Sequence, residues 1–151
     1  MTDLTQVSAM LQETNGLTLA TVDPDGTPRA TPLFFATDGT ISLLFLSDPD
    51  SQHSRNLSRD PRAAVGIYPQ EQDWQRIRGL QMKGRVDVPA DAEAKEAMTC
   101  YRSRFPFIAA IQTAIAKGRI YRFRPHWVRL IDNRLGFAYH REWEFPQSGS
   151  P

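Results

Sequence analysis

The stretch LTLATVDPDGTPRATPLFFATDGTISLLFLS, residues 17–47, decides the fold class. It holds three runs rich in apolar and β-branched residues, at 17–22, 29–37 and 41–47, and such runs are typical of strands. The tetrapeptides DPDG and TDGT separate the runs, and both are strong turn signals because glycine, proline and aspartate favour tight turns. Three strands joined by two tight turns predict an antiparallel meander.

The rest of the chain adds further strand and helix patterns. Strands are expected at 62–68, 76–88, 119–132 and 135–143. Helices are expected at 2–14, 51–59 and 90–104, with another running on to residue 116. Gly79 and Gly84 interrupt one strand pattern, which predicts bends or bulges there, as barrel closure requires. About seven strands, with helices gathered after the fifth, predict an α+β fold that is mainly β and built on an antiparallel barrel.

Length and charge limit the class of protein. A chain of 151 residues suits one domain, expected at 1–145, with a flexible tail at 146–151. There are 18 lysines and arginines against 17 aspartates and glutamates, so no net basic field exists to gather nucleic-acid phosphates. The longest apolar stretch, 41–46, is too short to span a membrane, and the N-terminus has no signal-peptide pattern. The lone Cys100 cannot form an internal disulfide, so a reducing cytoplasm is the expected location. The balanced charge and the short apolar stretch predict a protein without nucleic-acid or membrane partners.

The segment from Asp50 to Asn56 is the strongest candidate for a ligand site. It starts a helix directly after a strand, and helix starts carry free backbone N–H groups and a partial positive charge that favour phosphate. Ser51, His53 and Arg55 add further donor groups, more than helix capping requires. The alternative is a capped helix with a solvated face, and the Asp50 carboxylate would compete with a bound anion.

Two strands carry further candidates. Arg29 and Thr31 project from one face of the second strand, where an arginine can hold a phosphate bidentately, and Pro32 marks this strand as an edge or a bulge. On the fifth strand, Gln81 offers a donor and an acceptor to an amide-like ring edge, near glycines that let a flat ring approach the backbone. The alternatives are an exposed strand arginine and a barrel strand with one solvated face.

Several common site types are not indicated. His53, His126 and His140 match no metal-ligand spacing, so no metal site is expected. The sequence has no P-loop, no Gly-x-Ser-x-Gly elbow and no Gly-x-Gly-x-x-Gly turn, which argues against a Rossmann dinucleotide domain.

Taken in order, these segments resemble the pyridoxamine 5'-phosphate oxidase-like family of FMN-binding split β-barrels. The resemblance runs from about residue 17 to 143 and rests on five motifs: LATV at 19–22, GTPRATP at 26–32, SQHSRNL at 51–57, DPRA at 60–63 and RGLQMKG at 78–84. RFPF at 104–107 and NRLGF at 133–137 resemble an uncharacterised bacterial subgroup of that family. The implied fold is a six- to seven-stranded antiparallel split β-barrel with peripheral helices.

The resemblance also implies a homodimer that holds two FMN molecules at its interface. It places one set of residues at the FMN phosphate: Arg29, Ser51, His53, Arg55 and Asn56. It places a second set along the flavin ring or its ribityl chain: Ala30, Thr31, Pro32, Leu46, Ser47 and Gln81. The partner's Trp127 or Trp143 would cover the site. Tight FMN binders of the family carry arginine or lysine where Gln52 and His53 stand, so we expect a modest or pH-dependent affinity.

The function that these expectations favour is that of an FMN-binding flavoprotein, an oxidoreductase acting on a small-molecule redox substrate. No residue stands out as a catalytic base. Three alternatives stay open. The same fold can bind the deazaflavin F420, it can bind haem with His126 or His140 as axial ligand, or it can serve as a non-catalytic stress or binding protein without a cofactor.

Overall fold

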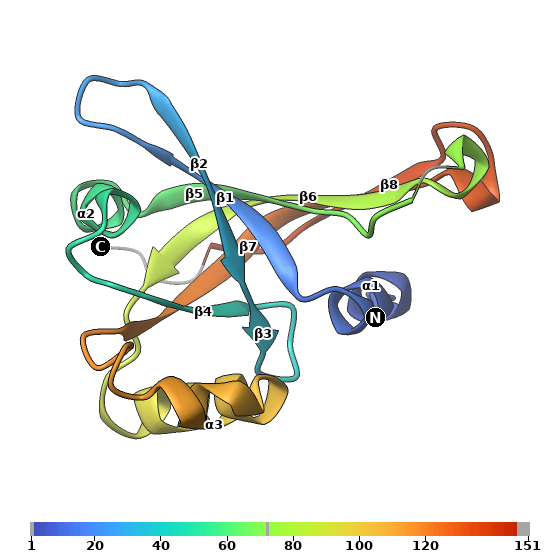
Figure 1. Ribbon diagram of the computed structural model, residues 1–151. Helices are drawn as coiled ribbons and strands as arrows, with labels where there is room; N and C mark the ends of the chain where they lie inside the picture. Colours follow the sequence, from blue (N-terminus) through green and yellow to red (C-terminus); the bar gives the residue numbers. More distant parts are fainter. Residues whose placement is uncertain (1, 72, 148–151) are drawn as a thin grey trace.

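The computed structural model describes residues 2–71 and 73–147, and Figure 1 shows how its elements are arranged. One antiparallel sheet has the strand order β2-β1-β5-β6-β7-β4-β3, and β8 pairs with β7 beside this path. The strands are β1 (Gly16–Val22), β2 (Pro28–Phe34), β3 (Ala36–Thr37), β4 (Leu43–Ser47), β5 (Arg62–Ile67), β6 (Arg78–Asp87), β7 (Arg119–Asp132) and β8 (His140–Glu144). The helices are α1 (Thr5–Glu13), α2 (Gln52–Arg59) and α3 (Asp91–Arg104), with short 3-10 segments η1 (Trp74–Arg76), η2 (Pro106–Ile111) and η3 (Asn133–Leu135).

The predicted fold class is confirmed: a mainly β, α+β split barrel with helices around it. The strand expected at 29–37 is broken at Phe35. The Phe35 side chain is fully buried and its backbone N–H donates to the Asn15 carbonyl at 3.0 Å, so the strand divides into β2 and the two-residue β3. β2 is an edge strand, as Pro32 predicted. Of the tail expected at 146–151, residues 148–151 lie outside the described residues.

The pairings of the predicted three-stranded meander are confirmed, with its middle strand divided into β2 and β3. β1 and β2 form a hairpin and β3 pairs with β4, but β4 also pairs on its other side with β7, which the prediction did not include. The physical reason lies in the apolar run at 43–45, whose side chains are all buried. A strand buried on both faces belongs inside the sheet, where two neighbouring strands satisfy its backbone.

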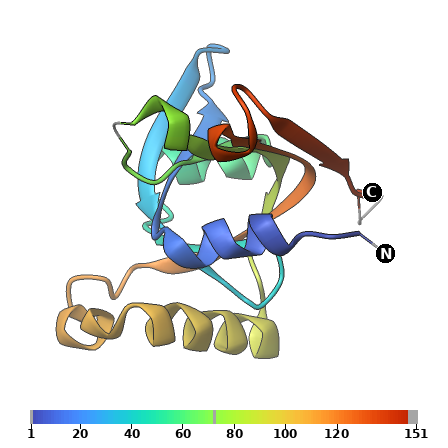
Figure 2. The same cartoon turned by 90° about the vertical axis from the view of Figure 1, so that its right-hand side faces the viewer.

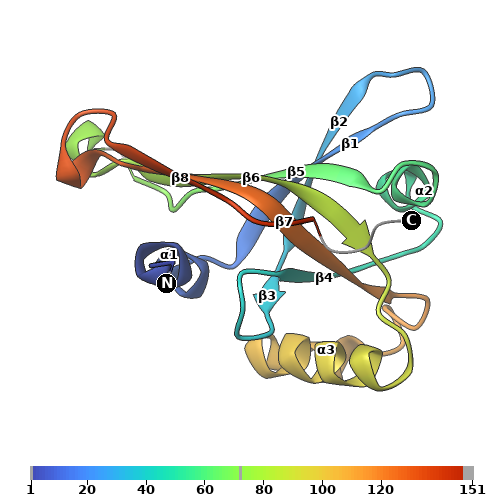
Figure 3. The same ribbon diagram turned by 180° about the vertical axis from the view of Figure 1, so that it is seen from behind.

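The helices cover the open sides of the barrel. Val7, Met10 and Leu11 of α1 belong to the main core, and Figure 2 shows α1 lying across the barrel with α3 below it. α3 contributes Ala97 and Tyr101 to a second, smaller core. The prediction of a helix that reaches residue 116 is wrong, because the chain forms only the short η2 and then turns over 112–117. Seen from behind in Figure 3, β6, β7 and β8 extend together into a long arm.

The bulge predicted at Gly84 is confirmed. The β6–β7 register shifts between Lys83 and Gly84, so that Lys83 faces Trp127 and Gly84 faces Pro125. A Cβ atom on Gly84 would lie 2.2 Å from the Arg124 carbonyl oxygen, a distance that no side chain can occupy. Glycine is therefore required at this position, where the paired strands β6 and β7 approach each other closely.

Replacing Gly84 with alanine tests this requirement. We expect Gly84→Ala to lower the free energy of unfolding by about 3 kcal/mol, because the β6 and β7 backbones must separate. Gly66→Ala is the matched control, since a Cβ atom there meets nothing within 4 Å. Urea unfolding of both variants measures the difference. Equal losses in the two variants would contradict the close-approach explanation.

Candidate functional site

The first turn of α2 and the end of β4 bring three polar side chains together. Ser51 caps the helix, and its hydroxyl oxygen accepts a hydrogen bond from the backbone N–H of Ser54 at 3.3 Å. The Nε2 atom of His53 lies 3.2 Å from the Ser51 hydroxyl oxygen and is also hydrogen bonded to the Ser47 hydroxyl. We call Ser47, Ser51 and His53 the serine–histidine cluster. It presents two hydroxyls and an imidazole beside the free N–H groups of a helix start.

His53 is held in its neutral form at neutral pH. The side chain is half-buried, and burial, followed by the positive charge of Arg29, holds the pKa of His53 below its ordinary value of 6.5. A neutral imidazole has one N–H donor and one acceptor nitrogen. The serine–histidine cluster therefore offers neutral hydrogen-bonding groups, and Arg29 is the source of positive charge near it.

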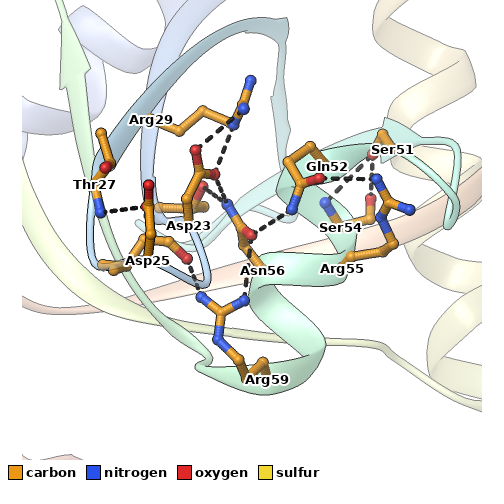
Figure 4. Close-up of polar contacts among 12 residues, drawn as sticks. Asp23, Asp25, Thr27, Arg29, Ser51, Gln52, Ser54, Arg55, Asn56 and Arg59 are labelled. Carbon is orange, nitrogen blue, oxygen red and sulfur yellow. Dashed lines mark hydrogen bonds and ion pairs between the residues drawn. The ribbon is translucent and has the colours of Figure 1, made fainter.

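Arg29 forms a bidentate ion pair with Asp23 within the β1–β2 hairpin. Its Nε and Nη2 atoms lie 2.8 and 3.1 Å from the two carboxylate oxygens (Figure 4). Hydrogen bonds from Arg29 and then from Asn56 hold the pKa of Asp23 below its ordinary value. The Arg29 side chain is 44% exposed, and a guanidinium has N–H donors beyond the two that Asp23 uses. Arg29 can therefore still contact an anion, although Asp23 compensates part of its charge.

Asn56 ties α2 to the hairpin. Its side chain is fully buried, and its Nδ2 atom donates to the Thr21 hydroxyl at 3.1 Å and to the Asp23 carboxylate at 2.8 Å. Its Oδ1 atom accepts from Gln52 at 2.9 Å and from Arg59 at 3.5 Å (Figure 4). Both ends of the amide are thus engaged inside the protein. The structure gives this predicted phosphate residue a set of internal partners that the sequence did not suggest.

Two more arginines lie around the cluster. Arg55 is exposed, and its Nη2 atom donates to the Gln52 Oε1 atom at 2.8 Å, along the surface of α2 (Figure 4). Arg119, which the sequence analysis did not single out, faces Ser47 in the β4–β7 register. Facing residues of antiparallel strands project from the same side of the sheet, so the exposed Arg119 shares a side with Ser47. Only the strand register places it there, and no sequence signal could have found it.

A cavity of about 690 Å³ is linked to the cluster through β4: none of Ser47, Ser51 and His53 lines it, but Leu46 does. Two predicted residues line it, Pro32 of β2 and Leu46 of β4, and Leu46 directly precedes Ser47 in the chain. Small-molecule pockets typically span about 300–1,000 Å³. The remaining lining residues carry no charge: Gly16, Leu17, Thr18, Leu33, Phe34, Gly66, Tyr68, Gln70 and Tyr101.

Tyr101 is one of the nine lining residues that sequence reasoning missed. It lies on α3 and is buried, and burial raises the pKa of its phenol, while a hydrogen bond with the Leu46 backbone acts in the opposite direction. The helical pattern showed only that α3 has a buried face. Its packing against β4 brings the phenol into the cavity.

Within one chain, Gln81 and Trp127 lie apart from the other predicted residues. Pro32 pairs with Thr18, Thr18 with Gly66, and Gly66 with Gln81, so Gln81 is three strands away from Pro32 on the outer face. At roughly 4.8 Å per strand this is about 14 Å. Trp127, one strand further, is half-buried beneath the Lys83 ammonium, which lies 4.8 Å from its ring centroid. Trp143 instead packs against the main core.

The other histidines lie away from the large cavity. His126 borders a separate cavity of about 280 Å³ near Arg85 and Arg124, and His140 is exposed on β8. In residues 2–71 and 73–147, no group of three histidine, cysteine, aspartate or glutamate side chains is arranged to hold a metal ion. Over the same residues, none of the helices has the length and apolar character needed to cross a membrane.

The fold and the site define a split-barrel protein with a polar helix start beside an uncharged cavity. The family model described as pyridoxamine 5'-phosphate oxidase matches residues 4–132, so the chain belongs to the pyridoxamine 5'-phosphate oxidase family. The chain is 34% identical over 150 residues to the pyridoxine/pyridoxamine 5'-phosphate oxidase of Bradyrhizobium diazoefficiens. That match covers 84% of this chain and 68% of the oxidase.

Solved structures share the fold. A haem binding protein from Mycobacterium smegmatis superposes with a TM-score of 0.76 at 24% identity, over 89% of this chain and 55% of that one. A FAD-binding protein from Mesorhizobium loti superposes with a TM-score of 0.67 at 18% identity, over 85% of this chain and 92% of that one. At these identities the similarity supports the split-barrel fold.

Changing Asn56 to aspartate tests its place in the site. Asn56→Asp keeps the shape of the side chain but sets a second carboxylate beside Asp23, where an N–H donor now lies at 2.8 Å. We expect the free energy of unfolding to fall by about 3 kcal/mol at pH 7, because the oxygen that replaces Nδ2 would face the Asp23 carboxylate, and only the other oxygen would keep the donors Gln52 and Arg59. Asn133→Asp is the control, because Asn133 is only half-buried at the start of η3. This change should lower the free energy of unfolding by about 1 kcal/mol or less. Similar losses in urea unfolding of the two variants would contradict this role.

His53 should make stability depend on pH. Because its pKa is lower in the folded protein than its ordinary 6.5, the unfolded chain binds the proton at a higher pH. Stability is therefore lost as pH falls below about 6.5, and His53→Gln should lose less stability than the wild type between pH 7.5 and pH 5. Urea unfolding at both pH values measures this, with the exposed His140→Gln as control. A His53→Gln curve parallel to that of the wild type would exclude the effect.

Proposed function

We propose that the protein is an FMN-binding flavoprotein of the pyridoxamine 5'-phosphate oxidase family. The serine–histidine cluster, Arg29 and Arg55 would hold the phosphate, and the flavin ring would enter the cavity along the backbone of 30–32 and past Leu46. The observation that carries the proposal is that β4 connects two parts: Ser47 belongs to a polar helix start with a nearby cation, and Leu46 lines an uncharged cavity of about 690 Å³. A bound flavin would supply the electron transfer.

The distribution of charge fits a ligand with one anionic end and one neutral, flat end. The helix start, Arg29 and Arg119 gather positive potential at one side of the site. The cavity lining has no charged side chain. FMN has this division between its phosphate and its ring system, so the residues present fit the group.

We also propose that the protein works as a homodimer. The outer face over β1, β2 and β5 carries small side chains, Ala20, Ala30, Ala64 and Gly66, which let a second chain approach closely. Gln81 and Trp127 lie on the same face, where Gln81 faces Gly66 of the cavity lining and Trp127 is one strand further. A second copy would bring its own Trp127 to the ring. The reaction would be an oxidation or reduction of a small molecule at the flavin.

Titration with FMN and riboflavin tests the phosphate assignment, since the two ligands differ only in the phosphate. We expect the wild type to bind FMN at least tenfold more tightly than riboflavin, because hydrogen bonds to a charged group contribute about 1.5–3 kcal/mol. The double variant Arg29→Ala, His53→Ala should lose most of that preference and keep its riboflavin affinity. Arg76→Ala, which removes an exposed arginine of η1, should bind both ligands like the wild type.

Flavin fluorescence measures both affinities. Equal binding of FMN and riboflavin by the wild type would contradict the phosphate site. Two measurements on the freshly purified protein distinguish the other cofactors. A Soret band in the visible spectrum would indicate haem, and a deazaflavin mass after heat release, measured by mass spectrometry, would indicate F420. A colourless protein that takes up no flavin would favour the non-catalytic function.

A further inference from the structure

One end of the large cavity is built from aromatic rings. Phe34 of β2 and Tyr101 of α3 line it. Phe105 is buried behind them, with its ring centroid 5.5 Å from that of Phe34 and 5.0 Å from that of Tyr101. Phe107 lies 5.9 Å from Phe105 and 6.3 Å from Phe34, with nearly half of its surface exposed. We call Phe34, Tyr101, Phe105 and Phe107 the aromatic wall.

The aromatic wall leaves apolar surface facing solvent. Phe34 is 52% exposed although Phe105 supports it from behind. An apolar ligand that covered this ring would gain the burial that the isolated chain lacks, and a flat aromatic ligand would add the favourable offset or edge contacts that aromatic pairs make. The wall therefore favours a planar aromatic ligand.

Within one chain, the same end of the cavity offers no counter-charge to an anion. None of the residues that line the cavity is charged. The arginine next to Phe105 in the chain, Arg104, is already engaged: it donates to the backbone carbonyls of Leu11 at 3.1 Å and Gln12 at 3.3 Å, and also to that of Thr14. The polar groups that remain on the lining are neutral hydroxyls and an amide, from Thr18, Tyr68, Gln70 and Tyr101.

We propose that the aromatic wall binds a neutral, planar aromatic compound that carries a hydroxyl or carbonyl group, and that this compound belongs to the substrate class of the protein. The inference rests on the proposed function in one respect, that a flavin ring lies in the same cavity. A phosphorylated ring, such as the compounds named for the related oxidases, would leave its second anion without a partner at this end.

Two probes with the same ring system and different charge test the ligand class. 2-Naphthol is neutral, planar and fluorescent, and 6-hydroxynaphthalene-2-sulfonate adds one negative charge to that ring. Equilibrium dialysis against the full chain, with and without FMN, measures the affinity of each probe. We expect the neutral probe to bind at least tenfold more tightly than the sulfonate in both states.

Two phenylalanine variants locate the binding. Phe34→Ala should weaken 2-naphthol binding about tenfold, and Phe34→Leu should lie between this variant and the wild type because it keeps apolar surface but loses the ring. Phe137→Ala removes an equally large ring that is 81% exposed near β8, and it should leave 2-naphthol binding within twofold. Equal effects of Phe34→Ala and Phe137→Ala would overturn the proposal, as would equal binding of the two probes.

FMN titration, carried out separately, distinguishes the two proposals. A protein that binds 2-naphthol selectively but not FMN would support the aromatic site and overturn the flavin assignment. A protein that binds FMN but neither naphthalene probe would overturn the aromatic site alone.

Discussion

The site depends on one partly buried contact, the hydrogen bond from the Asn56 amide to the Asp23 carboxylate at 2.8 Å. Asn56 is on the helix whose first turn carries Ser51 and His53, and Asp23 is on the hairpin that carries Arg29. A fully buried amide has to be satisfied at both ends, so its partners fix where the helix lies against β1. The same carboxylate fixes the direction of Arg29. A single amide therefore positions the neutral and the charged parts of the candidate phosphate site relative to each other.

The ion pair with Asp23 fixes the orientation of Arg29 but lowers the net positive charge of the site. A phosphate has to compete with the Asp23 carboxylate. His53 is neutral for two reasons that act in the same direction, burial and the proximity of Arg29. An incoming dianion would reverse the second of these, because its negative charge favours the protonated ring. The charge state of the site is thus set by the ligand as well as by pH, which a lysine at this position would not allow.

The sequence predicted what depends on local chemistry. The DPDG turn, the edge position of Pro32, the helix that follows Asp50 and the bulge at Gly84 all follow from the residues at those positions. It did not predict what depends on register and tertiary packing. The pairing of β4 with β7 was not predicted, because β7 lies more than 70 residues further along the chain. For the same reason Arg119 was missed beside Ser47 and Tyr101 beside Leu46. The partners of Asn56 were missed because a helical asparagine has no sequence pattern that shows which strand its amide will meet.

The curled sheet separates two kinds of surface that meet at β4. Ser47 of β4 belongs to the serine–histidine cluster, with Arg29 close by. The preceding residue, Leu46, lines the cavity that ends in the aromatic wall. The cation nearest to those rings along the chain, Arg104, is bound to backbone carbonyls. Arg104 is held at the end of α1, and Phe34 stays half exposed although Phe105 and Phe107 contact its ring. A ligand that was charged throughout would gain nothing from the aromatic end, and one that was wholly apolar would leave the helix start unused. If both proposals hold, the two ends together would select a pair of neighbouring ligands, one anchored by a phosphate and one held by its ring alone.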